Sequence, residues 1–243
     1  RIIEYLDNDR KEYRCTMELG IHTNTCDIWG EVLERKDADH LTEEEIRAAF
    51  DLFIGKISQV PPIYSALKIK GKKLYEYARA GQEVEIKPRE IMIYSLDVEE
   101  IKGRQVTFCV TCGKGTYLRS ICRDVGSVLG VGGTMTGLVR LASGAFRIED
   151  SVEMEDLRQM SREEIAEKMV TMDYPLTSFS KCKVDRKTAT DFIHGRRISP
   201  GGIFAEKPEG KVRIYYEGVF LGMAEFTEKP GELKPDKVFQ TEI

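Results

Sequence analysis

The sequence predicts an α+β protein with a mixed or antiparallel sheet, flanking helices and a small β-barrel-like domain at its C-terminus. Polar and apolar residues alternate through 12–21, and strand-like runs follow at 91–98 and 106–112. A helical pattern comes directly after the last of these runs. The final stretch of about sixty residues is short for an independent core, which is typical of a small appended domain.

Length and charge limit the class of protein. The chain has 243 residues and a net charge of −4, which suits one large domain with a small appendage. A negatively charged chain does not coat nucleic acid indiscriminately, so such contacts must come from a local basic patch. No apolar run reaches the length of a membrane span. The six cysteines are scattered, as reduced thiols in a cytoplasmic protein would be.

Cys109 and Cys112 form a lone Cys-x-x-Cys pattern. A zinc site would need a second pair, or histidines at zinc spacing, and neither follows. The two cysteines also lie in a predicted strand, where an odd offset points them to opposite faces. We therefore expect no metal site here.

The alternating run at 12–21 predicts a half-buried strand. One face of this strand holds Tyr13, Cys15, Met17 and Leu19. A turn-rich stretch at 22–27 comes next, and a second strand is predicted at 28–33.

Two capping boxes predict helix starts. Thr42 with Glu45 is the first, and Ser161 with Glu164 is the second. The helix after the first box has an apolar stripe made of Ile46, Ala49, Phe50, Phe53 and Ile54. The prolines at 61–62 cannot continue a helix, so they end this regular pattern.

The helix predicted after the strand at 106–112 is central to the interpretation. Thr116 is a good N-cap type for it. Its apolar stripe consists of Leu118, Ile121, Cys122, Val125 and Leu129. Arg119 lies at the edge of the stripe, and Arg123 lies one turn on, closer to solvent. Such an arginine can hold a carboxylate or a phosphate with its planar fork; alternatively, it is a surface arginine that packs its stem.

Residues 64–79 carry the densest positive patch of the chain, with tyrosines between the cations. The candidate contact residues in it are Tyr64, Lys68, Lys70, Lys72, Lys73 and Arg79. Aromatic rings stack on bases and cations neutralise phosphates, so this pattern favours looped or single-stranded RNA. The alternative is a solvated loop whose lysines provide solubility.

A change in composition near 174–183 predicts a boundary between one domain at 1–178 and another at 179–243. In the second domain, residues 185–194 are expected to form a helix that Gly195 ends. A hairpin is predicted from the segments 211–216 and 219–226.

Four ordered stretches together carry a resemblance to a known family. They are residues 11–20 with 23–27, 59–81, 113–130 and 138–146. With them, nearly the whole chain resembles the bacterial tRNA pseudouridine synthase B family. The resemblance implies a pseudouridine-synthase sheet in 1–178 with an RNA-gripping insertion at 59–89. It also implies a PUA-like RNA-binding β-barrel at 179–243.

The family's activity is the isomerisation of uridine 55 in the tRNA T-loop to pseudouridine, without cofactor or metal. The resemblance implies that the base is flipped out and that an aspartate acts as covalent nucleophile. Arg119 matches the arginine that pairs with that aspartate. Tyr13 matches a tyrosine that stacks on the uracil, and Leu138 matches an apolar residue of the uracil pocket. Ordinary core residues would show the same pattern at both positions. Arg123 is grouped with the RNA contacts.

The family's nucleophilic aspartate belongs to a Gly-Thr-Leu-Asp-Pro motif, which is absent from these 243 residues. Asp27 and Asp124 lie in other stretches, and we interpret Asp27 as a turn residue. The chain starts at Arg1 inside a helix-like pattern and has no initiator methionine. We therefore expect a piece of a longer polypeptide, inactive alone, whose N-terminal segment carries the nucleophile.

Two alternative functions remain open from the sequence. The first is a non-catalytic tRNA-binding protein or RNA chaperone on the same scaffold. The second is a subunit of a guide-RNA-dependent synthase, which is disfavoured because extra length and basic tails are missing. The tRNA T-arm is the expected partner, with no protein partner required and a monomeric state.

Overall fold

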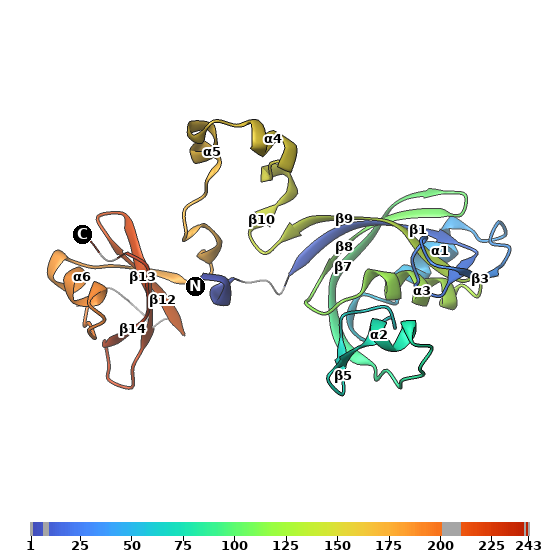
Figure 1. The fold of residues 1–243 in the computed structure, drawn as a ribbon, viewed down its shortest axis with the longest axis horizontal. Helices are drawn as coiled ribbons and strands as arrows, with labels where there is room; N and C mark the ends of the chain where they lie inside the picture. The colour runs from blue at the N-terminus through green and yellow to red at the C-terminus, as the bar shows by residue number, and fades with distance from the viewer. Residues whose placement is uncertain (1, 7–9, 201–209, 241, 243) are drawn as a thin grey trace. The chain divides into compact units, whose positions relative to one another are not determined.

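A computed structural model describes residues 2–6, 10–200, 210–240 and 242 (Figure 1). The chain divides into two compact units, one made of Asn8–Ser151 and the other of Arg1–Asp7 with Val152–Ile243. The boundary between the two compact units thus lies near residue 151. The domain boundary predicted at 178–179 is a different division, and it stays a prediction.

The first unit is built on a six-stranded antiparallel sheet with the strand order β10-β9-β1-β8-β7-β4. The strands are β1 (Lys11–Leu19), β4 (Gly55–Gln59), β7 (Arg89–Lys102), β8 (Gln105–Cys112), β9 (Gly133–Ser143) and β10 (Phe146–Arg147). Strand β1 lies between β8 and β9. The predicted α+β class with an antiparallel sheet is therefore confirmed.

Helices α1 (Glu43–Asp51) and α3 (Leu118–Val128) pack on one face of this sheet (Figure 1). The alternation predicted for β1 is confirmed, because Cys15, Met17 and Leu19 are buried beneath the helices. Helix α3 comes very close to β9 at Gly126. A Cβ there would lie 2.2 Å from the backbone nitrogen of Gly133, so this position requires glycine.

The capping box of α1 is confirmed. Thr42 accepts a hydrogen bond from the Glu45 backbone N–H, and the Glu45 carboxylate accepts one from the Thr42 backbone N–H. Ile46, Ala49 and Phe50 of the predicted stripe are buried and Phe53 packs beside them, whereas Ile54 is exposed because the helix ends before it.

The second strand was predicted at 28–33, and the first half of that prediction is wrong. Residues 28–30 form a turn, and β3 (Val32–Arg35) pairs with β2 (Ile21–Thr23). The turn forms because the backbone N–H of Trp29 donates to the Asp27 carboxylate and that of Gly30 donates to the Asp27 carbonyl. The interpretation of Asp27 as a turn residue is confirmed.

The basic segment forms the short strands β5 (Lys68–Ile69) and β6 (Lys72–Lys73), followed by helix α2 (Leu74–Arg79). A 3-10 turn, η2 (Ile148–Asp150), ends the first unit. Within the described residues, no helix is long and apolar enough to cross a membrane.

The second unit contains a four-stranded sheet with the order β11-β12-β13-β14. Its elements are η1 (Ile2–Tyr5), α4 (Met154–Gln159), α5 (Arg162–Lys168), η3 (Tyr174–Leu176), β11 (Ser180–Lys183), α6 (Arg186–Ile193), β12 (Lys211–Tyr216), β13 (Val219–Phe226) and β14 (Leu233–Val238). The predicted hairpin is confirmed, with Glu217 and Gly218 at positive φ between β12 and β13. The barrel stays a prediction.

Both helices predicted in this unit, one from a capping box and one from its end at Gly195, are confirmed. Asp185 caps α6, which ends at its C-cap His194 before Gly195. Ser161 and Glu164 form the capping box of α5. Helix α6 packs its Phe192 into the core of the four-stranded sheet.

Candidate active site

The first turn of α3 is held by a buried glutamine. The Tyr117 backbone N–H donates to Gln59 Oε1 at 2.9 Å, and Gln59 Nε2 donates to the Tyr117 carbonyl at 3.2 Å. Gln59 is only 2% exposed. The prediction of Thr116 as N-cap is wrong: Tyr117 is the N-cap, and the Thr116 hydroxyl donates to the Gly113 carbonyl. Gln59 was not predicted as a site residue, because no local spacing connects it with Tyr117.

Arg119 lies in this first turn and is half-buried. Its Nη2 donates to the Tyr64 carbonyl at 2.9 Å, and its Nη1 donates to the Thr25 carbonyl at 3.4 Å. The guanidinium thus connects two loops that are distant in sequence. A guanidinium has five N–H donors, so the same side chain can also bind a carboxylate. The interpretation of Arg119 as an ordinary surface arginine does not fit this position.

Tyr13, Leu138 and Arg140 lie on one face of the sheet. In the β1–β9 register Tyr13 pairs with Arg140 and Cys15 pairs with Leu138, and residues directly opposite each other share a face. The Cys15 sulfur lies 3.7 Å from that of Cys122, so this is the face that α3 covers. Leu138 is nevertheless 44% exposed, and the alternative of an ordinary core leucine is wrong.

The Tyr13 hydroxyl has a raised pKa. Its burial is the main cause, and the nearby Cys112 adds to the shift, whereas the Arg140 guanidinium opposes it through charge and a hydrogen bond. Tyr13 therefore stays protonated around neutral pH. Sequence analysis missed Arg140, although a spacing of two from Leu138 on a strand would have placed it on the same face.

Arg123 forms hydrogen bonds with other residues of this chain. Its Nε lies 2.7 Å from Asp124 Oδ1, and its Nη2 donates to the Val60 carbonyl at 3.0 Å. The Ser120 hydroxyl donates to the same carbonyl at 2.9 Å. Arg123 therefore helps to fix the 59–60 loop against α3, and its predicted contact with RNA stays a prediction.

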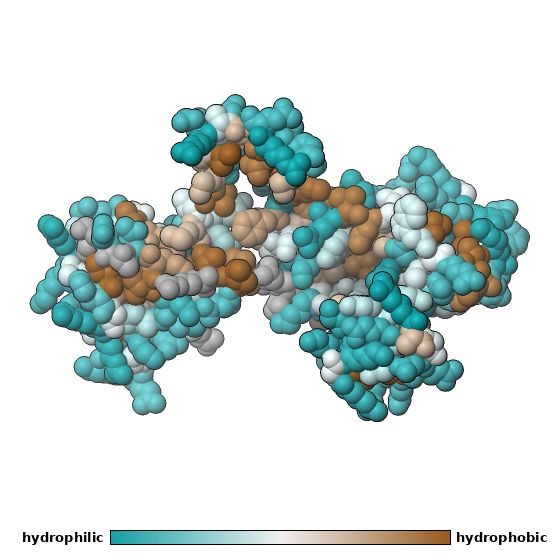
Figure 2. Space-filling view, viewed as in Figure 1, coloured by the Kyte–Doolittle hydropathy of each residue, from teal (hydrophilic) through white to brown (hydrophobic). Residues whose placement is uncertain are grey.

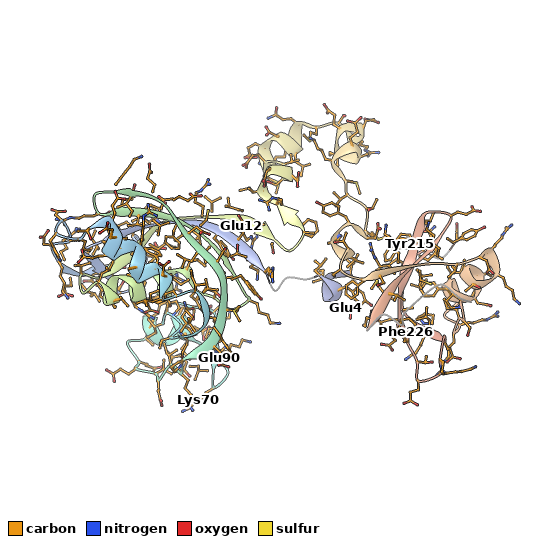
Figure 3. The ribbon with its side chains drawn as sticks, turned by 180° about the vertical axis from the view of Figure 1, so that it is seen from behind. Glu4, Glu12, Lys70, Glu90, Tyr215 and Phe226 are labelled. Atoms are coloured by element: carbon orange, nitrogen blue, oxygen red, sulfur yellow. The ribbon has the colours of Figure 1, made fainter. Side chains whose placement is uncertain are left out.

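The basic segment keeps its cations at the surface beside aromatic rings. Lys72 Nζ lies 4.6 Å from the Tyr77 ring centroid, and both Lys73 and Arg79 lie 5.4 Å from that of Tyr75. Lys68, Lys70 and Arg79 are exposed, and Figure 3 shows Lys70 at the outer end of the segment. The Tyr64 carbonyl connects this segment to Arg119.

Cys109 and Cys112 point to opposite faces of β8, as predicted. Cys112 is buried, whereas the Cys109 thiol donates to Glu99 Oε1 at 3.0 Å. No cluster of three or more potential metal ligands occurs among the residues that the structure describes.

Comparison with known proteins identifies the class. The N-terminal domain model of the TruB family pseudouridylate synthases matches residues 1–118. The tRNA pseudouridylate synthase B C-terminal domain matches 119–178, and the C-terminal model of pseudouridine synthase II TruB matches 180–239. The chain belongs to the TruB family of pseudouridine synthases.

Individual relatives within this family carry the name tRNA pseudouridine synthase B. The chain is 41% identical over 239 residues to tRNA pseudouridine synthase B of Clostridium perfringens, covering 96% of this chain and 80% of the relative. It is 40% identical over 236 residues to the protein of the same name in Burkholderia mallei, covering 95% and 77%.

Solved structures agree in fold. A chain of a Cbf5-Nop10-Gar1 complex matches with a TM-score of 0.68 and 24% identity, covering 99% of this chain and 69% of that one. A chain in an H/ACA RNP bound to a substrate RNA matches with a TM-score of 0.69 and 22% identity, covering 99% and 69%. At this identity the likeness concerns the fold alone.

Proposed function

We propose that this protein acts as a tRNA pseudouridine synthase on uridine 55 of the T-loop. The observation that carries this proposal is the 41% identity over 239 residues to a protein named tRNA pseudouridine synthase B. In the reaction, the bond between the uracil nitrogen and the ribose breaks, the base turns, and the ribose joins a ring carbon. The ring carbon loses its proton to water and the freed nitrogen takes up a proton, so the composition is unchanged and the isomerisation needs no redox partner.

Arg119 is proposed to orient the nucleophile. A guanidinium beside an aspartate favours its ionised form and fixes its direction through paired hydrogen bonds. The bonds to the Thr25 and Tyr64 carbonyls support this role, because they hold the arginine in place before the carboxylate arrives. The aspartate motif of the family is absent from these 243 residues, so the activity is proposed for a polypeptide that contains it.

Tyr13 and Leu138 are proposed to receive the flipped uracil. An aromatic ring stacks on the base, and an exposed leucine on the same face provides an apolar contact. The raised pKa of Tyr13 keeps its hydroxyl protonated, so it can donate a proton or a hydrogen bond. The nearby Arg140 holds the phenol through the interaction described above.

The basic segment is proposed to bind the T-arm. Extruding the target base costs a few kcal/mol, and contacts between cations and phosphates offset this cost. The binding residues proposed are Tyr64, Lys68, Lys70, Lys72, Lys73, Arg79 and Arg123. Their contribution to affinity should fall as salt is raised, because counterion release drives such contacts.

Residues 179–243 are proposed to form the PUA-like RNA-binding domain, and residues 1–178 the catalytic domain. The four-stranded sheet with α6 and the separate family match at 180–239 support this division. We propose further that the protein works in the cytoplasm as a monomer and needs no protein partner.

A tritium-release assay tests the function. A polypeptide carrying the aspartate motif ahead of this sequence is incubated with unmodified tRNA labelled at uracil carbon 5, where pseudouridine formation releases the label. Release from uridine 55, and its loss in a tRNA with cytidine there, is the expected result. A protein that binds this tRNA but releases no label would instead be an RNA chaperone.

A further inference from the structure

The loop between β2 and β3 carries the only tryptophan of the sequence, Trp29, and this residue is 93% exposed. Burying an indole removes a large apolar area from water, so a nearly bare ring on a folded protein calls for an explanation. Ile28 and the β3 residues Val32 and Leu33 are also exposed, and Figure 2 shows apolar surface near β3.

The loop itself is firmly fixed. The Ile28 backbone N–H donates to the Met135 carbonyl at 2.9 Å, and the Met135 N–H donates to the Cys26 carbonyl at 3.1 Å, so the loop is attached to β9. A Cβ on Gly30 would lie 2.2 Å from Thr25 Oγ1, which shows how tightly the turn closes. The ring of Trp29 is thus exposed on an ordered support.

The same loop touches the candidate active site. The Thr25 carbonyl accepts a hydrogen bond from Arg119, and Met135, to which the loop is bonded, lies three residues before Leu138 on β9. The loop is thus attached both to Arg119 and to the strand that carries Leu138, which makes it a candidate contact for nucleotides beside a uracil bound there.

We propose that Trp29 is a stacking platform for an unpaired base of the substrate RNA loop, close to the target uridine. The inference rests on the proposed function, since it needs the RNA at Arg119. An unpaired base presents a flat apolar face, and an exposed indole on a rigid support binds it with little loss of conformational entropy.

Binding of unmodified tRNA to this chain tests the proposal directly, because the single tryptophan reports its own environment. Indole fluorescence should be quenched along the same curve that filter binding gives for the complex. Trp29→Ala should weaken binding at least about fivefold, the lower end of the range for stacking one base. That factor should be the same at low and high salt, unlike the effect of losing a phosphate contact.

Matched variants separate stacking from other effects. Trp29→Phe should keep most of the affinity, whereas Trp29→Leu should behave like Trp29→Ala. Leu52→Ala, which removes another exposed apolar side chain, should bind the tRNA with the same affinity as the protein without substitutions.

Unquenched fluorescence at saturation, or unchanged affinity of Trp29→Ala, overturns the proposal and leaves a protein partner as the reason for the exposed ring. A factor that disappears at high salt also overturns it. Failure of the unmodified chain to bind tRNA contradicts the proposed function itself, and is therefore distinct from failure of Trp29 alone.

Discussion

The first turn of α3 and the basic segment at 64–79 place cations in opposite ways. Arg119 is half-buried, and two backbone carbonyls from separate loops accept its hydrogen bonds. Lys68 and Lys70 are exposed, and Lys72 and Lys73 pack their ammonium groups near tyrosine rings. One cation is thus fixed by the fold, and the others remain available at the surface.

This difference matches two physical tasks. A group that orients a nucleophile must be positioned before the reaction, because reorganising it in the transition state costs free energy. Groups that capture a polyanion need only lie near phosphates, since counterion release supplies the affinity. We therefore expect Arg119 to determine the rate and the lysines to determine binding.

The largest effect is expected for Arg119→Ala. In a polypeptide with the aspartate motif, the rate of tritium release should fall about 100-fold or more, as when one preorganised donor is removed. The free energy of unfolding should fall by about 2 kcal/mol, because the Thr25 and Tyr64 carbonyls lose their donor. Single-turnover kinetics and urea unfolding measure the two effects.

Arg119→Lys is the matched control for this variant. It keeps the charge but loses the planar fork, so the rate should stay well below that of the unmodified enzyme while tRNA affinity changes little. A lysine variant with full activity would show that charge alone suffices, and the proposed orienting role would be wrong.

The second effect concerns binding. Changing Lys68, Lys70, Lys72 and Lys73 together to Ala should weaken tRNA binding about tenfold or more at low salt. The slope of log affinity against log salt should also become shallower by about 3. Filter binding over a salt series measures both quantities.

A control variant removes three positive charges, at Lys36, Lys56 and Lys102, which pair with glutamates elsewhere in the same unit. It changes the net charge nearly as much, so it should leave the slope nearly unchanged if the basic segment forms the interface. Equal slopes for the two variants would mean that only net charge matters.

The sequence predicted the elements better than their connections. Strand β1, both capping boxes and the hairpin at Glu217 follow from local patterns, and all are observed. The start of α3 was misplaced because Thr116 is locally suited to be an N-cap. The N-cap is instead Tyr117, whose backbone is held by Gln59, 58 residues earlier in the chain.

The candidate site shows the same limit. The alternation predicts which face of a strand Tyr13 occupies, but not how far a helix covers that face. Leu138 shares the face that α3 covers and is still exposed, and only the packed structure reveals this. The carbonyl partners of Arg119 come from residues 25 and 64, which no sequence spacing relates to position 119.

Gln59→Ala tests the anchorage of α3 and should have an intermediate effect. It leaves the Tyr117 backbone N–H without its partner, whereas the Tyr117 carbonyl keeps the hydrogen bond from the Ile121 N–H, and a buried unsatisfied group costs about 1–3 kcal/mol. Urea unfolding should show this loss, and activity should fall more than tRNA affinity because Arg119 follows two residues later. Gln82→Ala, at an exposed glutamine that accepts from Lys72, should leave stability unchanged; equal stability of both variants would contradict the anchorage.

The smallest effect concerns the ionisation of Tyr13, which reports on the candidate active site without disrupting its packing. Burial raises the pKa of Tyr13 and Arg140 opposes that shift, so Arg140→Ala should raise the pKa further. Because the folded pKa lies above the unfolded one, the stabilisation that Tyr13 provides is complete below the unfolded pKa. It is lost as pH rises through the folded pKa. Ultraviolet absorbance is titrated with pH for the protein and for its Tyr13→Phe variant, and the difference between the two curves reports the ionisation of Tyr13 alone. The same pair of titrations is repeated in the Arg140→Ala background. A fall in pKa on removing Arg140 would show that its guanidinium does not act on Tyr13 as the structure indicates.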